Sequence, residues 1–463
     1  MDAHVTALRA EAVTLLRELI RVDTSNPPGG ETPAAEVLAR YLTANGVTCE
    51  LVARDPDRAN LVARLPGRHE GPSLMLLGHT DVVPAEGERW THPPFAGVLD
   101  DADWVWGRGA LDMKNELATR AVAMATIARS GEALDGEVLF VAAADEEDGT
   151  GAVGMSWLVD ERPDLKADYV INEGATERLE LEDGRTIVTI SVGEKAAAAV
   201  RITALGTGGH ASMPYGVDHA VPALAELIRR LTAYRPRRRL IPATEALLER
   251  LLGPGGSDDL DTAITRADAL HPALGRLIAP LFSTTIAPTR LHGSPALNVL
   301  PGRAAVDCDC RLLPGTTVAD LRDELTHALG SDVAYELELL EQPVGGTIST
   351  VDSPLFEACA EFLARHDSGA ILVPVLCPGF TDSHYVRAAF GSVAYGIWPS
   401  RFTSHQIWSA TVHGDDERVH ADDLGYATQF HVELCRTLLN RPSGPTSDSQ
   451  PDQFGGLSPP VPA

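Results

Sequence analysis

Lysine is scarce in this 463-residue chain, in which only Lys114, Lys166 and Lys195 occur and the formal net charge is −27. A protein that binds nucleic acid or an anionic membrane needs basic patches, because its positive charges must neutralise phosphates. The one tight basic run, Arg237–Arg239, is interpreted as a solvated face. The sequence therefore argues against nucleic acid and against a membrane surface as partners.

Paired cysteines and long apolar runs are also missing. The six cysteines contain no C-x-x-C pair, and Cys308 and Cys310 alternate with aspartates, so we expect small core residues and no disulfide framework. No apolar stretch approaches the roughly 20 residues that a membrane span needs. Residues 1–4 lack the basic and apolar parts of a signal peptide. We expect a cytoplasmic protein.

The length exceeds that of one typical hydrophobic core, so we expect more than one domain. Buried-strand patterns alternate with helical ones, which indicates an α/β sheet flanked by helices. After residue 195 the pattern changes to a β-α-β-β-α-β-like order with an irregular insertion over 235–285, and the first pattern resumes at Ser353. We predict a main domain that carries the candidate site over 1–195 and 344–441, a smaller α+β domain over 196–343, and a disordered tail over 442–463.

The stretch from Leu74 to Pro84 gives the clearest local signal for chemistry. Four apolar residues run into Gly-His-Thr-Asp, as in a strand buried on both faces at the centre of a parallel sheet. His79 and Asp81 are two residues apart, so on a strand both side chains point to one face. An unpaired charge there would be costly. Either His79 binds a metal while Asp81 holds its other ring nitrogen, or Asp81 satisfies an ordinary core histidine.

Other acidic and histidine side chains follow predicted buried strands or stand before helices: the Asp145-Glu146-Glu147 triplet, Glu173, Asp112 and His413. Carboxylate and imidazole ligands suit zinc, and also cobalt or manganese. Two histidines and three carboxylates are too many for one open tetrahedral zinc, but they suffice for two metals when one carboxylate bridges. Each also has a plain alternative on its own: a helix N-terminal acid for Asp112, a turn for Glu173 and a surface loop for His413.

Together these segments resemble the M20 metallopeptidase and amidohydrolase family, which includes aminoacylase, succinyl-diaminopimelate desuccinylase and carboxypeptidase G. The resemblance covers residues 8–440 and implies a zinc-peptidase-like mixed sheet flanked by helices, with an inserted ferredoxin-like α+β lid domain that often forms the dimer interface. The matching segments, in family order, are 24–29 (Thr-Ser-Asn-Pro-Pro-Gly), 78–84 (Gly-His-Thr-Asp-Val-Val-Pro), 107–114 (Gly-Arg-Gly-Ala-Leu-Asp-Met-Lys), 145–147 (Asp-Glu-Glu), 172–174 (Asn-Glu-Gly), 208–214 (Gly-Gly-His-Ala-Ser-Met-Pro), 298–301 (Asn-Val-Leu-Pro), Arg311, and His413 with Glu417.

The resemblance implies a ligand set for two zinc ions. His79 and Glu173 would bind one ion, Glu147 and His413 would bind the other, and Asp112 would bridge them. A cis peptide bond after Asp112 is a further implication.

The resemblance also implies roles outside the ligand set. Asp81 would orient the imidazole of residue 79, and Glu146 would act as general base. His210 would stabilise the oxyanion, in dimers from the partner chain, and Asn298 and Arg311 would hold the carbonyl and carboxylate of the substrate. The lid would close over substrate through hinges at 193–198 and 341–346.

We therefore expect a di-zinc hydrolase that cleaves an amide bond next to a free carboxylate, in a short peptide or an N-acyl amino acid. One alternative is a di-zinc aminopeptidase of related fold. The lid motifs at His210, Asn298 and Arg311 argue against it, since we expect aminopeptidases of that type to lack the inserted lid. The other is a non-catalytic binder with the same fold, against which the complete ligand set argues. The exact substrate and the choice between monomer and homodimer stay open.

Overall fold

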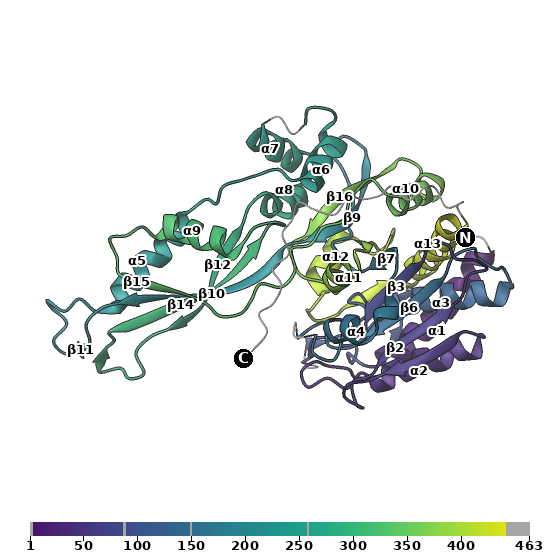
Figure 1. Cartoon of the computed structure of the whole chain (residues 1–463), viewed down its shortest axis with the longest axis horizontal. Coiled ribbons are helices and arrows are strands. Elements are labelled where there is room, and N and C mark those ends of the chain that lie inside the picture. Colours follow the sequence, from purple (N-terminus) through teal and green to yellow (C-terminus); the bar gives the residue numbers. More distant parts are fainter. Residues whose placement is uncertain (1–2, 87–88, 149–150, 257–258, 441–463) are drawn as a thin grey trace.

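The computed structural model describes residues 3–86, 89–148, 151–256 and 259–440. It has a large α/β part that contains the N-terminus and a smaller part built on a second sheet (Figure 1). The tail predicted over 442–463 lies outside the described residues. Within those residues, no helix combines the length and apolar character that crossing a membrane requires. All six cysteines are free thiols.

The large part is organised around a nine-stranded mixed sheet of the described chain. The order is β1-β2-β6-β3-β7-β17-β9-β16, with β8 beside β9, and the central β6, β3 and β7 are parallel. A small sheet of β18, β5 and β4 lies apart from it. The strands are β1 Thr48–Val52, β2 Asn60–Leu65, β3 Leu74–His79, β4 Val98–Leu99, β5 Trp104–Trp106, β6 Val138–Ala143, β7 Tyr169–Asn172, β8 Arg178–Glu180, β9 Thr186–Glu194, β16 Ala370–Cys377, β17 Val393–Gly396 and β18 Arg418–His420.

Helices cover both faces of this sheet, which explains why its central strands are apolar without a break. In β3, Leu74 and Leu76 belong to one core cluster, whereas Met75 and Leu77 belong to another. The first cluster is covered by α1 Ala3–Ile20, α2 Thr32–Ala44, α3 Lys114–Ser130, α10 Pro354–His366 and α13 Ala421–Leu439. The second is covered by α4 Met155–Glu161 and α11 Ser383–Phe390.

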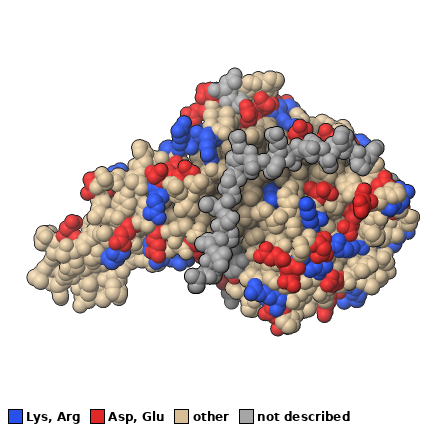
Figure 2. Space-filling view, in the orientation of Figure 1, with Lys and Arg blue, Asp and Glu red and all other residues tan. Residues whose placement is uncertain are grey.

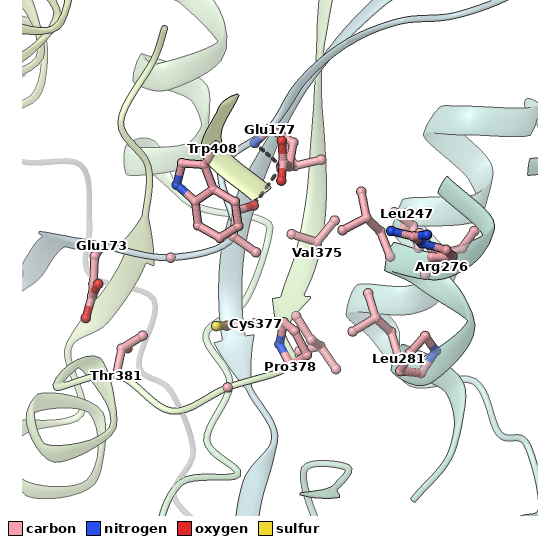
Figure 3. A pocket seen from close by; sticks show the side chains of 18 of the residues that line it. Glu173, Glu177, Leu247, Arg276, Leu281, Val375, Cys377, Pro378, Thr381 and Trp408 are labelled. Atoms are coloured by element: carbon pink, nitrogen blue, oxygen red, sulfur yellow. Dashed lines mark hydrogen bonds between the residues drawn. The ribbon is translucent and has the colours of Figure 1, made fainter. Parts of the chain in front are cut away.

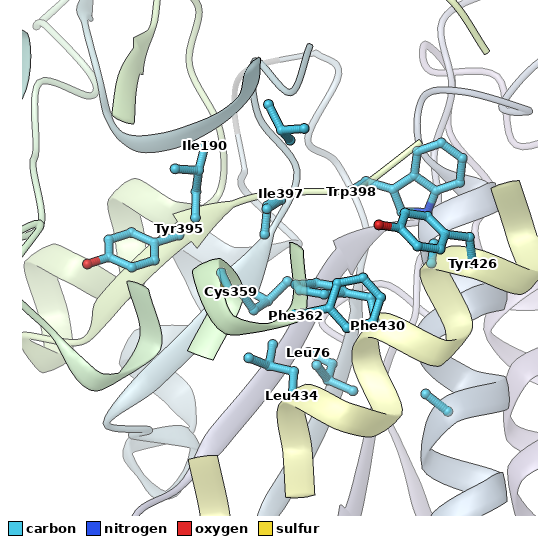
Figure 4. Close-up of a cluster of buried hydrophobic side chains, with 14 of the residues drawn as sticks. Leu76, Ile190, Cys359, Phe362, Tyr395, Ile397, Trp398, Tyr426, Phe430 and Leu434 are labelled. Atoms are coloured by element: carbon cyan, nitrogen blue, oxygen red, sulfur yellow. The ribbon is translucent and has the colours of Figure 1, made fainter. Parts of the chain in front are cut away.

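Aromatic side chains fill the first core where α10 and α13 meet the sheet. Phe362 of α10 and Phe430 of α13 have ring centroids 5.1 Å apart in an edge-to-face arrangement, beside Leu76 of β3 (Figure 4). Such a pair adds about 0.5–1.5 kcal/mol to the stabilisation that comes from burial. This packing fixes the C-terminal helix against the strand that ends in His79.

The smaller part contains an antiparallel four-stranded sheet in the order β12-β14-β10-β15. Its strands and helices follow one another as β-α-β-β-α-β, the order that the sequence predicted. Leucines of α5 and α9 pack on the sheet in a core of their own. The short strands β11 and β13, which are far apart in the sequence, pair antiparallel, and β11 lies at the far end of this part (Figure 1). The elements are β10 Ala196–Leu205, β11 Gly209–His210, α5 Ala220–Ala233, β12 Thr285–His292, β13 Val299–Leu300, β14 Arg303–Leu312, α9 Val318–Leu329 and β15 Tyr335–Leu339.

The expectation of an irregular segment over 235–285 is wrong. The segment forms α6 Pro242–Leu252, α7 Leu260–Leu270, α8 Pro272–Ile278 and the 3₁₀ helix η3 Ala279–Phe282. Pro242 and Pro272 stand in the first turns of their helices, where the missing N–H has no intrahelical partner to lose. Each of these prolines therefore stands at the beginning of a helix, in a segment where the sequence predicted irregular structure.

The described residues of these inserted helices contribute to the core of the large sheet and do not contribute to that of the small one. Leu247 and Leu251 of α6 belong to the core that β3 shares with α1 and α13. Arg250 places its guanidinium over the ring of Phe356, 4.7 Å from the centroid. The helices fall inside the range predicted for the smaller domain, yet they share the core of the larger part. The domain boundaries themselves stay a prediction.

Acidic and basic side chains are interspersed on the face drawn in Figure 2. Many basic groups pair locally with acids, for example Arg64 with Glu137 and Asp164. The net charge of −27 therefore comes from the aspartates and glutamates that outnumber the basic residues.

Candidate metal centre

The central strands bring the predicted site residues to one edge of the large sheet. His79 ends β3, the Asp145–Glu147 triplet follows β6, and Glu173 follows β7. These three strands are neighbours and run parallel. The carboxyl ends of parallel strands meet at the same edge, where open α/β sheets gather their ligands.

Two groups of side chains at this edge share Asp112. Nε2 of His79 lies 3.2 Å from Oδ1 of Asp112 and 3.7 Å from Oε1 of Glu173. Nε2 of His413 lies 3.1 Å from Oδ2 of Asp112 and 3.3 Å from Oε2 of Glu147. Within each group the potential ligand atoms all lie within 4.8 Å of one another. The two oxygens of one carboxylate thus face two separate clusters.

A buried carboxylate holds the loop that carries Asp112. Glu417 is fully buried and accepts the backbone N–H groups of Leu111 at 2.6 Å and Asp112 at 3.1 Å. It also accepts Nη1 of Arg108 at 2.6 Å. The bond between Asp112 and Met113 is cis, which confirms the prediction from the sequence.

His413 reaches the centre from a strained backbone position. Its φ is 58°, in the left-handed region that residues other than glycine seldom adopt. Asp145, next to the Glu146-Glu147 pair, has a φ of 64°. Such positions persist where the surrounding structure fixes them, and they cluster at functional sites.

Asp81 lies directly behind the centre and is buried. Its carboxylate accepts the backbone N–H groups of Glu146 at 3.2 Å and Glu147 at 3.0 Å. The amide of Asn26 donates to it at 2.8 Å. Nδ1 of His79 lies 3.4 Å from Oδ1 of Asp81 and 3.0 Å from its backbone carbonyl. Asp81 therefore fixes both the imidazole and the loop that bears the two glutamates.

The electrostatics of the cluster favour bound cations. Hydrogen bonds to Asp112 and Glu147 raise the pKa of His413 to about 10. Burial opposes protonation of His79, but Glu173 and Asp112 raise its pKa well above the ordinary value. Burial and the neighbouring Asp112 raise the pKa of Glu147 to about 7. Carboxylates are thus in surplus around two imidazoles, which is the donor set of a carboxylate–histidine metal site.

An unsatisfied atom gives a second test of this fit. Oε1 of Glu147 is buried and has no hydrogen-bond partner among the described residues. A buried carboxylate oxygen without a partner is costly, so it needs an occupant. A cation held by Glu147 would meet that need.

Among the described residues, the two ligand clusters and their ion pairs do not include the carboxylate of Glu146. Burial, followed by the charge of Glu173, raises its pKa well above that of an ordinary glutamate. A carboxylate of that kind suits proton transfer near neutral pH.

Three predicted site residues do not join the centre in this chain. His210 belongs to β11 and Asn298 to the turn before β13, and both are exposed. The pair of strands β11 and β13 lies at the far end of the smaller part, where Figure 1 labels β11. Arg311 lies on β14, where its guanidinium donates to Asp309 at 2.7 and 3.0 Å.

Sequence reasoning assigned no role to several residues that shape the centre. Asn26 and Glu417 stood in the matched segments without a function, and their partners Asp81 and Arg108 are far from them in sequence. Asp382 is buried, its Oδ2 has no partner among the described residues, and burial raises its pKa. The sequence predicted no role for Asp382, which is the one acidic residue within 379–384.

A cavity of about 360 Å³ opens beside the centre. Asp112, Glu173 and His413 line one end of it, and side chains of α6, α8 and η3 line the other. In Figure 3, Glu173 lies on one side and Leu247 and Leu281 lie on the opposite side. This volume is within the range of small-molecule sites.

Residues 75–437 match the peptidase family M20/M25/M40. Aminoacylase-1 of Sus scrofa is 28% identical over 94% of this chain and 97% of its own length. Succinyl-diaminopimelate desuccinylase of Methylobacterium sp. (strain 4-46) is 28% identical over 89% of this chain and 92% of its own.

Solved structures share the fold over nearly the whole chain. The M20 family metallo-carboxypeptidase Sso-CP2 of Sulfolobus solfataricus aligns with a TM-score of 0.68 at 21% identity and covers 95% of this chain and 100% of its own. Aminopeptidase PepT of Bacillus cereus aligns with a TM-score of 0.62 at 16% identity, over 93% of this chain and 98% of its own. An aminopeptidase therefore shares the fold, smaller part included, so the argument that a lid excludes an aminopeptidase is wrong.

Proposed function

Since the chain belongs to the peptidase family M20/M25/M40, we propose that this hydrolase cleaves the amide bond of an N-acyl amino acid or short peptide with two bound metal ions. The ions would be zinc, with cobalt or manganese as substitutes. The observation that carries the proposal is the pair of ligand clusters that share Asp112. The relatives aminoacylase-1 and succinyl-diaminopimelate desuccinylase support an N-acyl amino acid as substrate.

The ligand set follows from the two clusters. His79 and Glu173 would hold one ion, Glu147 and His413 the other, and Asp112 would bridge them. When bound, a pair of such ions polarises a carbonyl and lowers the pKa of water towards about 7. Asp81 positions His79 from behind, as an acid does for a metal-binding imidazole.

Glu146 is the proposed general base. It would take a proton from the attacking water and deliver it to the leaving nitrogen. Its raised pKa, caused first by burial and then by Glu173, lets one carboxyl group accept and return that proton. Glu147 is tied to His413 and is not free for this role.

The exposed positions of His210 and Asn298, at the paired strands β11 and β13, fit a homodimer. We propose that His210 of one chain stabilises the oxyanion in the centre of its partner, while Asn298 and Arg311 hold the carbonyl and carboxylate of the substrate. Large exposed apolar side chains that follow β11 or precede β13 in the sequence support an interface there, among them Tyr215 at 96% exposure and Leu297 at 102%.

The test of the chemistry is Glu146→Gln. We expect kcat to fall by about 10²–10⁴-fold with the metal content unchanged, because only proton transfer is lost. The matched control is Asp148→Asn, an exposed acid on the same loop, which should retain full turnover. Full activity in Glu146→Gln would show that another group is the base.

The aminopeptidase alternative uses the same centre and is separated by substrates. Hydrolysis of peptides with a blocked amino end and a free carboxylate supports the proposal. Hydrolysis that requires a free amino end, with the carboxylate blocked, would select the aminopeptidase instead.

A further inference from the structure

The cavity beside the candidate centre is apolar over most of its wall. Leu247 and Leu251 of α6, Leu274 of α8, Leu281 of η3 and Val375 of β16 line it. In Figure 3, Val375 lies between Glu173 on one side and Leu247 on the other. The apolar wall is therefore continuous with the side chains that face the candidate metals.

The inserted helices form this wall and are firmly fixed. Leu247 and Leu281 are 1% and 2% exposed and belong to the main core. Nζ of Lys195 donates to the backbone carbonyls of Pro280 at 3.0 Å and Ser283 at 2.9 Å, which holds η3 against the end of β9. A rigid apolar wall needs little reorganisation to accept a ligand, which favours affinity.

The charges of the cavity discriminate between the two halves of an N-acyl amino acid. Asp112 and Glu173 at its near end would hold the metal ions, and the carboxylate of Glu177 in the lining would repel the free carboxylate of the amino-acid half. Among the described residues that line the cavity, Arg276 is the one lysine or arginine, and its side chain is exposed on the helical far wall. The uncharged acyl half is the part that suits this space.

On the basis of the proposed function, we propose that the cavity is a subsite for a straight-chain apolar acyl group, so that the preferred substrates are N-acyl amino acids with medium to long chains. The carbonyl of the acyl group lies at the candidate metals, and its chain extends towards α6 and η3. Water adds across the C–N bond, which yields a fatty-acid carboxylate and a free amino acid.

The size of the cavity sets the expected chain length. A water-sized group occupies about 30 Å³, so about 360 Å³ accommodates roughly twelve such groups, enough for a ten-carbon chain. Each buried methylene group should raise kcat/KM about three- to fourfold, which corresponds to about 0.8 kcal/mol. A decanoyl group is therefore a suitable probe.

The experiment measures kcat/KM for N-acetyl, N-hexanoyl and N-decanoyl derivatives of a panel of amino acids, with the zinc-loaded protein. Calorimetric titration with acetate, hexanoate and decanoate adds a readout that does not depend on turnover. Leu247→Trp fills the cavity and should lower the ratio of decanoyl to acetyl kcat/KM by at least tenfold. The control is Leu252→Trp, on the same helix but outside the cavity lining, which should keep the ratio.

The outcomes separate this inference from the proposed function. A rise with chain length in both kcat/KM and carboxylate affinity supports the subsite. Hydrolysis of acetyl derivatives without any gain from longer chains overturns the subsite and leaves the proposed function intact. Hydrolysis of none of the derivatives overturns the proposed function, whereas decanoate binding would still report on the cavity. The acyl series in the unchanged protein decides the matter even where Leu247→Trp fails to fold.

Discussion

Removing the carboxylate of Glu417 should weaken both the fold and the metal centre. Glu417 is 0% exposed and pairs with Arg108, whose side chain is 3% exposed. Removing one partner of a buried ion pair costs about 3–5 kcal/mol, because the other charge stays buried and uncompensated. The N–H groups of Leu111 and Asp112 also lose their acceptor. We therefore expect Glu417→Ala to lower the free energy of unfolding by about 4 kcal/mol.

The same substitution should reduce metal affinity, because Glu417 fixes the loop that carries the shared Asp112. Loss of a partner that orients a ligand typically lowers affinity by about 10–100-fold. Urea unfolding followed by circular dichroism gives the stability, and titration with zinc gives the affinity. Glu417→Gln keeps one acceptor oxygen for the backbone and should lose less of both.

The control for this prediction is Glu336→Ala, which breaks the exposed pair of Glu336 with Arg303. That variant should unfold at the same urea concentration as the unchanged protein and bind zinc equally well. Glu417→Ala that matched Glu336→Ala in both measurements would refute the claim that the buried carboxylate holds the centre together.

Two further predictions concern the buried Lys195 and the exposed His210 of β11. Burial lowers the pKa of Lys195 to about 8 from 10.5, so between these values the folded chain releases a proton that the unfolded chain keeps. The free energy of unfolding of the unchanged protein, relative to that of Lys195→Met, should therefore rise by about 1.4 kcal/mol per pH unit from pH 8 to 10.5, as measured by urea unfolding. A difference that stays constant with pH would contradict the lowered pKa of Lys195. To test whether His210 acts across chains, His210→Ala and Glu146→Gln are measured separately and together. Each variant should be inactive alone, and mixed dimers should regain turnover. Mixtures that stay inactive would show that His210 does not act across chains.

Much of the main sheet and its cluster could be predicted from the sequence, because the signals are local. An apolar run that ends in His79 and Asp81 identifies a buried strand and its functional end within a few residues. The strands that end near Glu147 and Glu173 carry the same signal. Neighbouring parallel strands then bring these ends together without further information.

The inserted helices could not be predicted in the same way. Prolines such as Pro242 and Pro272 indicate breaks in regular structure, although each of these two stands in the first turn of a helix. Leu247 and Leu251 stabilise α6 through the core of the large sheet, and this docking cannot be seen in the local pattern. The apolar cavity depends on that docking, so it was also absent from the sequence analysis.

The supporting residues of the centre were missed because their partners are distant in sequence. Arg108 and Glu417 are separated by 309 positions, and Asn26 and Asp81 by 55. Neither helical nor strand periodicity carries information over such separations. The position of His210 on β11, far from the centre, likewise depends on how the two sheets are arranged.

The most direct test of two ions that share Asp112 is anomalous diffraction at the zinc edge from crystals of the zinc-loaded protein. The account predicts two peaks about 3.5–4 Å apart, one beside His79 and Glu173 and the other beside Glu147 and His413, with the Asp112 carboxylate between them. A single peak, or none within reach of Asp112, would contradict it.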